Sequence, residues 1–407
     1  MTSFGMQIQN QYVRKLVASD ATGPTSSQGR SVCVSEDASF VVVGGETDHG
    51  GRGAAWVFGR TATMPQSGEI KCEWEQCCAK LTAVDQVGNA EFGHSVAMSS
   101  NASLVAVGAP GDRRGQGCVV LFERNAHDRA WVQRDHKFVC SGAIGAARQG
   151  HSVALSADGR VLATGAPGHA AGGGAVFVRH LIAGRWTDGI TLQPHANDSA
   201  AACAFGTSVA LSADGHTLVV GAPNGAHNSG STYVFTLSSN SWQERVRLLS
   251  DEQPASFALH GTSVAVSADG LTVASGGTAR KQSQGSTMVW STSRADWSRV
   301  DHSQLVVGVG GRQPTTQGAS VALRADGRVL AVGAPSDDGS VGSVFVFARG
   351  HAGWEQRERL SSTADMMGTN ASQGSSVAFS SSGQTLAVGA ISDATFTGAT
   401  WMYCSSS

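Results

Sequence analysis

Two histidine–serine pairs are the residues of this sequence that most suggest catalysis. Gly93-His94-Ser95 and Gly150-His151-Ser152 resemble the start of the Gly-x-Ser-x-Gly turn that exposes a nucleophilic serine in hydrolases. That turn needs a second glycine and a helix after the serine, whereas Val and Ala follow here and an apolar, strand-like run begins. The sequence therefore predicts no catalytic residue at these serines, and we expect the chain not to be an enzyme.

Metal-binding patterns are equally weak. The tight turns that recur along the chain read Ser-Ala-Asp-Gly, and one carboxylate cannot replace the roughly six to eight oxygens that surround calcium. Cys72, Cys77 and Cys78 lie close together but lack a second metal-spaced pair. We predict neither a metal nor another cofactor, and we predict that Cys33 and Cys118, at strand positions, are buried thiols.

The Gly-x-Ser motif also shows that the chain is built of repeats. Gly-x-Ser-Val begins seven times, with gaps of 64, 57, 56, 55, 57 and 56 residues. The seven glycines are Gly29, Gly93, Gly150, Gly206, Gly261, Gly318 and Gly374. A period of this size is typical of a repeat architecture, and a serine that recurs seven times suits packing or backbone hydrogen bonding better than catalysis.

Each repeat carries the pattern of four antiparallel strands. In the third copy, two apolar runs flank Ala157-Asp158-Gly159, and an Asp-Gly turn between apolar runs is a strong hairpin signal. A third run with aromatic residues follows, and then a fourth run opened by tryptophan. The tryptophans are Trp74, Trp131, Trp186, Trp242, Trp297 and Trp354. Four such strands make one propeller blade, and we interpret the tryptophans as blade-to-blade packing residues.

The two ends of the chain complement each other. The seventh copy stops after its third strand, whereas a strand-like run over residues 11–18 precedes the first Gly-x-Ser-Val. We therefore predict an all-β fold, a single domain over residues 1–407. It is a seven-bladed propeller whose last blade is completed by the N-terminal strand, with blades beginning near 29, 93, 150, 206, 261, 318 and 374. Closure of the ring would protect the sheet edges, which an open solenoid would leave uncapped.

At this point the motifs resemble a known family. Phe92-Gly93 and Phe205-Gly206, followed by Gly-Ala-Pro at 108–110, 165–167, 221–223 and 333–335, look like the FG-GAP repeat of the integrin α-chain head and of its calcium-free relatives. The resemblance implies the propeller fold and says little about function. Some copies depart from the pattern: Gln stands for Phe at Gln28, Gln149, Gln317 and Gln373, and 44–46 and 276–278 replace Gly-Ala-Pro.

Strand alternation places two classes of loop on one face of the ring. These loops join the fourth strand to the next first strand, and the second strand to the third, and variable loops on rigid blades are where binding usually resides. The candidate binding residues there are Asp112, Arg113, Arg114, Asn224, His227, Arg280, Lys281, Asp337 and Asp338. The variable position of Gly-x-Ser is predicted to line the channel mouth, with Arg30, His94, His151, Thr207 and Thr262. An insertion near residues 61–72, on the opposite face, is a second and weaker candidate.

Composition limits the partners. Charged residues are 15% of the chain and the net charge is −2, so no overall positive field attracts nucleic acid. No apolar stretch is long enough to cross a membrane and no secretory leader is visible, so a cytoplasmic or organelle-associated location is favoured over secretion. The sequons at Asn101, Asn197 and Asn370 matter only in a secreted protein.

Three functions fit these observations. The first is a non-catalytic protein-interaction scaffold, or a structural subunit of a larger assembly, which binds protein partners through the loop-rich face. The second is a carbohydrate-binding propeller, in which equivalent pockets hold glycans. The third is an enzyme whose site is built from unlike loops at the channel mouth. We favour the first because the sequence combines seven similar units with no unique acid–base or metal constellation.

Overall fold

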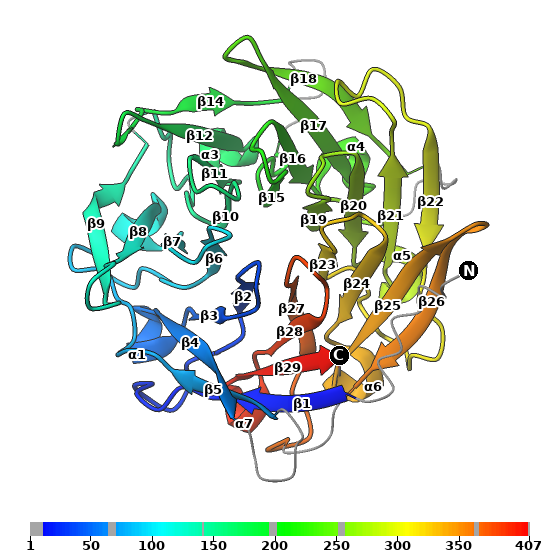
Figure 1. The fold of residues 1–407 in the computed structure, drawn as a ribbon. Coiled ribbons are helices and arrows are strands. Elements are labelled where there is room, and N and C mark those ends of the chain that lie inside the picture. The colour runs from blue at the N-terminus through cyan, green and yellow to red at the C-terminus, as the bar shows by residue number, and fades with distance from the viewer. Residues whose placement is uncertain are drawn as a thin grey trace.

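The computed structural model describes residues 11–63, 71–140, 142–194, 202–250, 257–361 and 366–405. Within them, seven antiparallel sheets surround a central axis as the blades of a propeller (Figure 1). The predicted all-β, seven-bladed fold is confirmed. Each blade runs outward from a short inner strand that follows Gly-x-Ser.

The strands are distributed over the blades as follows. Blade 1 holds β2 (Ser31–Val34), β3 (Phe40–Gly45), β4 (Ala54–Thr63) and β5 (Lys71–Gln76); blade 2 holds β6 (Ser95–Met98), β7 (Leu104–Ala109), β8 (Cys118–Arg124) and β9 (Trp131–Phe138). Blade 3 holds β10 (Ser152–Leu155), β11 (Val161–Ala166), β12 (Ala175–Ile182), β13 (Arg185–Trp186) and β14 (Ile190–Leu192); blade 4 holds β15 (Ser208–Leu211), β16 (Thr217–Ala222), β17 (Ser231–Ser238) and β18 (Ser241–Leu248). Blade 5 holds β19 (Ser263–Val266), β20 (Thr272–Gly277), β21 (Ser286–Ser291) and β22 (His302–Val306); blade 6 holds β23 (Ser320–Leu323), β24 (Val329–Ala334), β25 (Ser343–Gly350) and β26 (Gly353–Leu360). Blade 7 holds β27 (Gln373–Phe379), β28 (Thr385–Ala390), β29 (Ala399–Ser405) and β1 (Gln11–Leu16).

The N-terminal strand closes the ring, as predicted. Strand β1 pairs antiparallel with β29, in a register that runs from Gln11 opposite Ser405 to Leu16 opposite Thr400. In Figure 1 the blue β1 lies beside the red β29, at the outer edge of the last blade. The two ends of the chain therefore share one sheet, and β29 keeps no free edge.

In two blades the outer strand differs from the prediction. In blade 3 the outer strand is split into β13 and β14, which both pair with β12. In blade 5, Trp297 lies ahead of β22 instead of opening it. Its side chain is buried and its indole donates a hydrogen bond to the carbonyl of Gly270, 2.9 Å away, so the prediction that Trp297 begins the fourth strand is wrong. This anchoring explains why the chain leaves strand pairing there.

The Gly-x-Ser motif forms the joint between blades. The serine hydroxyl of each blade donates to the carbonyl of the motif glycine in the next blade, from Ser31 to Gly93 (2.9 Å) round to Ser376 to Gly29 (2.8 Å). The five bonds between them join Ser95, Ser152, Ser208, Ser263 and Ser320 to the corresponding glycines. Seven such bonds close a circle, which explains why the serine occurs in every copy.

The core lies between the blades. Every residue of β7 is buried, and Val105 and Val107 pack in one cluster with Val42 and Val57 of the preceding blade. Because blades cover both faces of such a strand, it is apolar throughout instead of alternating. The stacking of neighbours therefore supplies the apolar burial that a single blade lacks.

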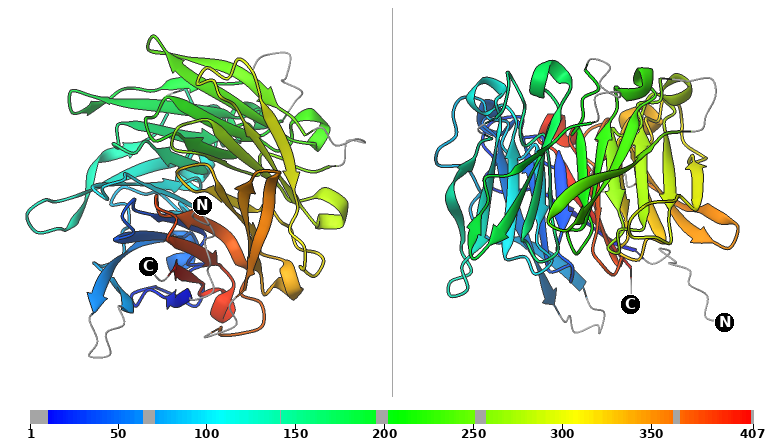
Figure 2. Two further views of the ribbon diagram at one scale, coloured as in Figure 1. Left: turned by 45° about the vertical axis from the view of Figure 1, so that its right-hand side comes forward. Right: turned by 90° about the horizontal axis from the view of Figure 1, so that it is seen from above.

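The loops divide between two faces. Short helical turns follow the second strand of each blade and gather along one rim of the ring, while the hairpins occupy the other (Figure 2, right). The turns are α1 (Asp48–Gly51), α2 (Asp112–Gly115), α3 (His169–Gly172), α4 (Gly225–Asn228), α5 (Arg280–Ser283), α6 (Asp337–Ser340) and α7 (Asp393–Phe396). We call the side with these turns and the loops that connect successive blades the loop face, and the opposite side the hairpin face. Among the described residues no helix has the length and apolar character needed to cross a bilayer.

Candidate functional site

The helical turns of the loop face share an unusual backbone. Each contains two successive residues with positive φ, such as Arg113 (φ 49°) and Arg114 (φ 61°) in α2. This left-handed conformation costs a non-glycine residue about 1 kcal/mol, and the seven turns tolerate it with side chains as different as alanine, lysine and aspartate. The repeat therefore imposes the shape of the turn, and the side chains at its tip are free to differ between blades.

A buried aspartate begins four of these turns. Asp48, Asp112, Asp337 and Asp393 are all at most 1% exposed. Each pairs with a cation from the outer strand of its own blade or from the residues just after that strand: Lys80 at 2.6 Å, Lys137 at 2.7 Å, Arg359 at 2.7 Å and Lys15 at 2.5 Å. We call each of these pairs a carboxylate clip. Breaking such a pair is costly, because removal of one partner leaves the other as a buried, uncompensated charge.

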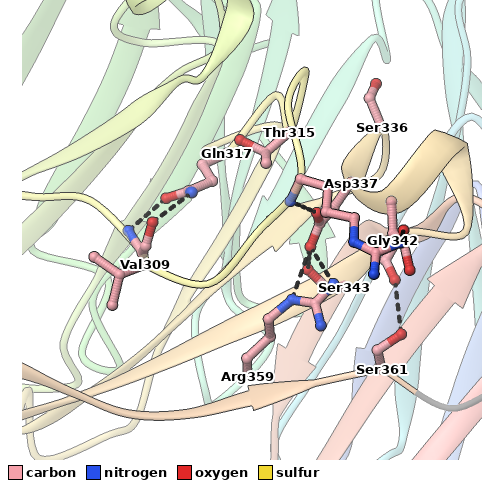
Figure 3. A network of polar contacts seen from close by, with 12 residues as sticks. Val309, Thr315, Gln317, Ser336, Asp337, Gly342, Ser343, Arg359 and Ser361 are labelled. Carbon is pink, nitrogen blue, oxygen red and sulfur yellow. Dashed lines mark hydrogen bonds and ion pairs between the residues drawn. The ribbon is translucent and has the colours of Figure 1, made fainter.

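The clip also holds the loop that enters the blade. In blade 6 one carboxylate oxygen of Asp337 accepts the backbone N–H of Arg312 (2.7 Å), and the other accepts the Arg359 guanidinium and the Ser343 hydroxyl (Figure 3). The equivalent backbone donors are Val87 to Asp112 (2.7 Å), Thr22 to Asp48 (2.5 Å) and Met367 to Asp393 (3.0 Å). The helical turn, the outer part of the blade and the entering loop are distant in sequence but meet at each clip. The clip therefore fixes their relative positions on the loop face.

The clipped blades form a continuous arc of the ring, from blade 6 through blades 7 and 1 to blade 2. In the remaining arc, His169, Gly225 and Arg280 occupy the position of the aspartate. His169 takes over part of the task in blade 3, since its Nδ1 accepts the N–H of Ile144 (3.2 Å). The loop face is thus asymmetric although its backbone repeats.

The glutamines that replace the phenylalanine of Phe-Gly hold the same loops. Gln28 accepts the N–H of Ala18 (2.7 Å), Gln149 that of Cys140 (2.8 Å) and Gln317 that of Gly308 (2.6 Å). Phe92 and Phe205 occupy the equivalent place as fully buried aromatic side chains. The position therefore requires a large buried side chain that either fills the core or satisfies the backbone of the adjacent loop.

The predicted binding residues divide by burial. Asp112 and Asp337 belong to clips and are fully buried, and Arg280 is 7% exposed, so these three side chains offer little surface to a partner. Arg113, Arg114, Asn224, His227 and Lys281 are exposed on the loop face, and Asp338 is partly exposed and pairs with Arg312 (2.8 Å). The supporting cations and the entering loops were not predicted, because nothing in the spacing of Lys80, Lys137 or Arg359 relates them to the aspartates.

Three of the five residues predicted to line the channel mouth lie together. Arg30 contacts Nε2 of His94 at 3.3 Å, and the rings of His94 and His151 lie 4.5 Å apart, so the residues of blades 1 to 3 form a continuous cluster. Thr207 and Thr262 instead turn back to the carbonyls of Ala204 (2.8 Å) and Leu259 (2.7 Å) in their own loops. The charged and ionisable members of this set therefore gather at blades 1 to 3.

Two glutamates complete this cluster. Glu46 accepts from Nδ1 of His94 and pairs with Arg30 at 3.0 Å, and Glu91 pairs with Arg148 at 2.9 Å. Oxygen and nitrogen atoms of Glu46, Glu91 and His94 lie within 4.8 Å of one another, a spacing compatible with a metal ion. Each carboxylate already has a guanidinium as counter-charge, and two guanidiniums beside a divalent cation would oppose its binding. The arrangement fits an ion-pair network better than a cation site.

The cluster shifts the titration of its members. Burial alone raises the pKa of Glu46, but the hydrogen bond from His94 and the charge of Arg30 outweigh it and lower that pKa to about 2. Burial lowers the pKa of His94, against the hydrogen bond to Glu46. Burial, with the nearby His94, Arg148 and Arg30, lowers the pKa of His151 to about 3. Both histidines are therefore neutral at pH 7.

Acidification is expected to destabilise the fold through His151. Its pKa is lower in the folded state (about 3) than its ordinary value of 6.5, so below pH 6.5 the unfolded chain binds a proton that the folded chain does not. As the pH is lowered below 6.5, this residue should therefore decrease the free energy of unfolding by up to about 1.4 kcal/mol per pH unit. Denaturant unfolding at pH 7.0, 6.0 and 5.0 should show a shallower fall for His151→Gln than for the unmodified chain. Equal slopes for the two proteins would contradict the assignment.

Apolar side chains are exposed along the loop face. Of the large apolar residues that are exposed in the described part of the chain, nine lie in its loops or turns: Val17, Val84, Val87, Ile144, Leu249, Phe257, Val309, Met367 and Phe396. The other three, Val132, Ile182 and Ile190, lie on or next to outer strands. Single exposed apolar residues are ordinary, and here most of them lie on one face of the ring.

Other predicted features are placed as follows. None of the six tryptophans is exposed, and Trp186 and Trp242 pack against Phe138 and His180 of the preceding blade, as the packing interpretation predicts. Cys118 is buried as expected, whereas Cys33 is only partly buried. Asn101 and Asn370 are exposed, and Asn197 lies outside the described residues.

The hairpin face carries a cleft between blades 1 and 2. It has a volume of about 1010 Å³ and is lined by residues that include Phe40, Cys77 and Trp131, with the Arg124 guanidinium 4.2 Å from the centre of the Phe40 ring. Most of the predicted insertion near residues 61–72 lies outside the described residues, and its role stays a prediction.

Seven four-stranded antiparallel blades, joined by the Gly-x-Ser circle and closed by β1, define a seven-bladed β-propeller. Residues 74–122 and 192–235 match the FG-GAP repeat family, in agreement with the resemblance that the Phe-Gly and Gly-Ala-Pro motifs show.

Structural similarity supports the fold alone. The chain is similar to the structure of U3-55K and to the crystal structure of the RRP9 WD40 repeats, each with a TM-score of 0.55 and 14% sequence identity. The matches cover 96% of this chain and 98% and 97% of those chains. A comparison with curated protein sequences finds no match.

Proposed function

We propose that this propeller is a non-catalytic protein-interaction scaffold that binds its partners through the loop face. The observation that carries the proposal is the concentration of exposed apolar side chains there. Two of them, Val87 and Met367, donate their backbone N–H groups to clip aspartates, which hold their loops in place. Loops fixed in this way cannot retract their apolar side chains, and they lose little conformational entropy when a partner covers them. The loop face thus presents fixed apolar side chains that a partner protein could cover.

The contacts of the motif serines and of the charged residues favour a binding function over a catalytic one. The hydroxyls of Ser95 and Ser152 are committed to the carbonyls of Gly150 and Gly206, so the histidines beside them in sequence do not activate them. The charged residues of the channel mouth neutralise one another in pairs. A seven-fold repeat with unlike loop tips suits the display of surfaces to other proteins.

Matched surface variants test the proposal. In the loop-face variant, Val84, Ile144, Val309 and Met367 are each changed to Asp; in the hairpin-side control, Val132 and Ile182 are changed to Asp. Both variants replace exposed side chains, so both should keep the melting temperature within a few degrees. In quantitative affinity capture from the source cells, we expect stoichiometric protein partners with the unmodified chain and the control, and their loss with the loop-face variant. Partners lost only with the control, or no stoichiometric protein with the unmodified chain, would overturn the proposal.

A further inference from the structure

We propose that the loop face binds, at the junction of blades 1 and 2, a short segment of a partner protein in which acidic side chains flank an apolar one. This inference rests on the proposed function and names the chemistry of the partner. The surface consists of Val84 and Val87 together with Arg52, Arg113 and Arg114, and we call it the blade 1–2 patch. All five side chains are exposed.

One loop brings these residues together. The chain between β5 and β6 passes between the turns of blades 1 and 2: the N–H of Glu91 donates to the carbonyl of Gly51 in α1 (3.0 Å), and the N–H of Arg113 in α2 donates to the carbonyl of Val87 (3.2 Å). The loop that carries the valines is therefore bonded to the turn that precedes Arg52 at one end, and Val87 itself is bonded to Arg113.

The clip of blade 2 fixes the valines in their exposed positions. Asp112 accepts the N–H of Val87, Lys137 donates to the carbonyl of Asp85 (2.7 Å), and Gln133 accepts the N–H of Val84 (3.0 Å). The side chain of Val84 is 87% exposed and that of Val87 50%. These three hydrogen bonds keep two aliphatic side chains exposed to water. A partner that covers them would remove apolar surface from water, which is favourable.

The charge of the patch selects the partner. Within the described residues, Arg52, Arg113 and Arg114 have no carboxylate within ion-pair distance, whereas Arg312 in the comparable region of blade 6 pairs with Asp338. Asp112, the acid nearest in sequence to two of these arginines, is fully buried and neutralised by Lys137. Asp85, between the two valines in sequence, is partly buried, and its carboxylate accepts hydrogen bonds from the Gln133 amide (3.2 Å) and the Lys137 N–H (3.4 Å). The three exposed guanidiniums outnumber this one acid, and acidic side chains on both sides of an apolar residue complement such a patch.

Nucleic acid fits the patch less well. Phosphates would pair with the arginines, but Val84 and Val87 offer no aromatic surface on which a base could stack. The two valines instead match the aliphatic side chain of a peptide. The arginines occupy left-handed positions that the other turns fill with Ala, Gly or Thr as well, so the fold does not require arginine there.

Selection from a display library of random dodecapeptides against the full chain tests the inference. We expect the enriched peptides to carry an apolar residue flanked by at least two acidic residues. As synthetic fluorescent peptides, they should bind Arg113→Glu/Arg114→Glu at least about tenfold more weakly, because like charges then face each other. They should also bind several-fold more weakly in 500 mM than in 50 mM NaCl. The matched control is Arg160→Glu/Arg328→Glu, on the hairpin face, which should bind normally.

Four results would overturn the inference: no enrichment, enriched peptides without acids, equal binding by the Arg113→Glu/Arg114→Glu variant, or tighter binding of a fluorescent single-stranded 12-mer oligonucleotide. The proposed function can fail separately. If the four-Asp loop-face variant loses its captured partner while Arg113→Glu/Arg114→Glu retains it, the loop face is the binding surface but this patch is not its site.

Discussion

Deletion of residues 1–18 should cost more than about 5 kcal/mol of unfolding free energy and leave the protein largely unfolded at 37 °C. The deletion exposes the edge of β29, removes the buried side chain of Leu16, and takes away Lys15, which pairs with the buried Asp393 at 2.5 Å. An uncompensated buried carboxylate alone accounts for about 3–5 kcal/mol of this loss.

A pair of point variants of β1 makes the same test more finely. Lys15→Ala leaves the buried Asp393 without its counter-charge and should lower the free energy of unfolding by several kcal/mol. Arg14→Ala changes a side chain that is 44% exposed and should lower it by less than about 1 kcal/mol. Urea unfolding measures both. If Lys15→Ala were as stable as Arg14→Ala, or if the truncated chain kept its melting temperature, the N-terminal strand would not be the latch of the ring.

Gly108→Ala should be strongly destabilising, with a loss of about 4 kcal/mol or more. A Cβ at this position would lie 2.0 Å from the carbonyl oxygen of Gly150 in the next blade and 2.3 Å from the hydroxyl of Ser95. These two atoms are the acceptor and the donor of the inter-blade hydrogen bond, so relief requires that bond to break and the two blades to separate.

The control for this substitution is Gly142→Ala. No atom lies within 4 Å of the Cβ that it would add, so stability should change by less than about 0.5 kcal/mol. Thermal unfolding of both variants distinguishes a contact effect from the general effect of replacing glycine. A Gly108→Ala protein as stable as Gly142→Ala would show that the blades are not in contact through these glycines.

The repeat and the strand pattern predicted most of the fold. The Asp-Gly hairpin signals and the missing fourth strand of the last copy were enough to place β1 beside β29, because an unpaired strand edge is unfavourable. The recurrence of serine correctly indicated a backbone-bonding role. Trp297 was misplaced because its hydrogen bond to Gly270 is a tertiary contact that no local pattern announces.

The site was less predictable than the fold. Aspartate in a glycine- and proline-rich turn is usually solvated, so the burial of Asp112 and Asp337 was not foreseen. Their partners, Lys137 and Arg359, lie 25 and 22 residues further along the chain, and only the return of the outer strand brings them close. The Gly-x-Ser periodicity placed Arg30, His94 and His151 together, but Glu46, at the proline position of a Gly-Ala-Pro segment, and Glu91, just before Phe92-Gly93, were not predicted to join them.

Hydrogen exchange of the intact protein tests the closed ring most directly. If β1 completes blade 7, a peptide covering residues 11–16 should exchange as slowly as one covering 399–405, since both then exchange only through global unfolding. Exchange of residues 11–16 within seconds at pH 7, while 399–405 remain protected, would contradict the latch. The closed ring, and with it the fixed arrangement of the loop face on which the proposed binding depends, would then have to be abandoned.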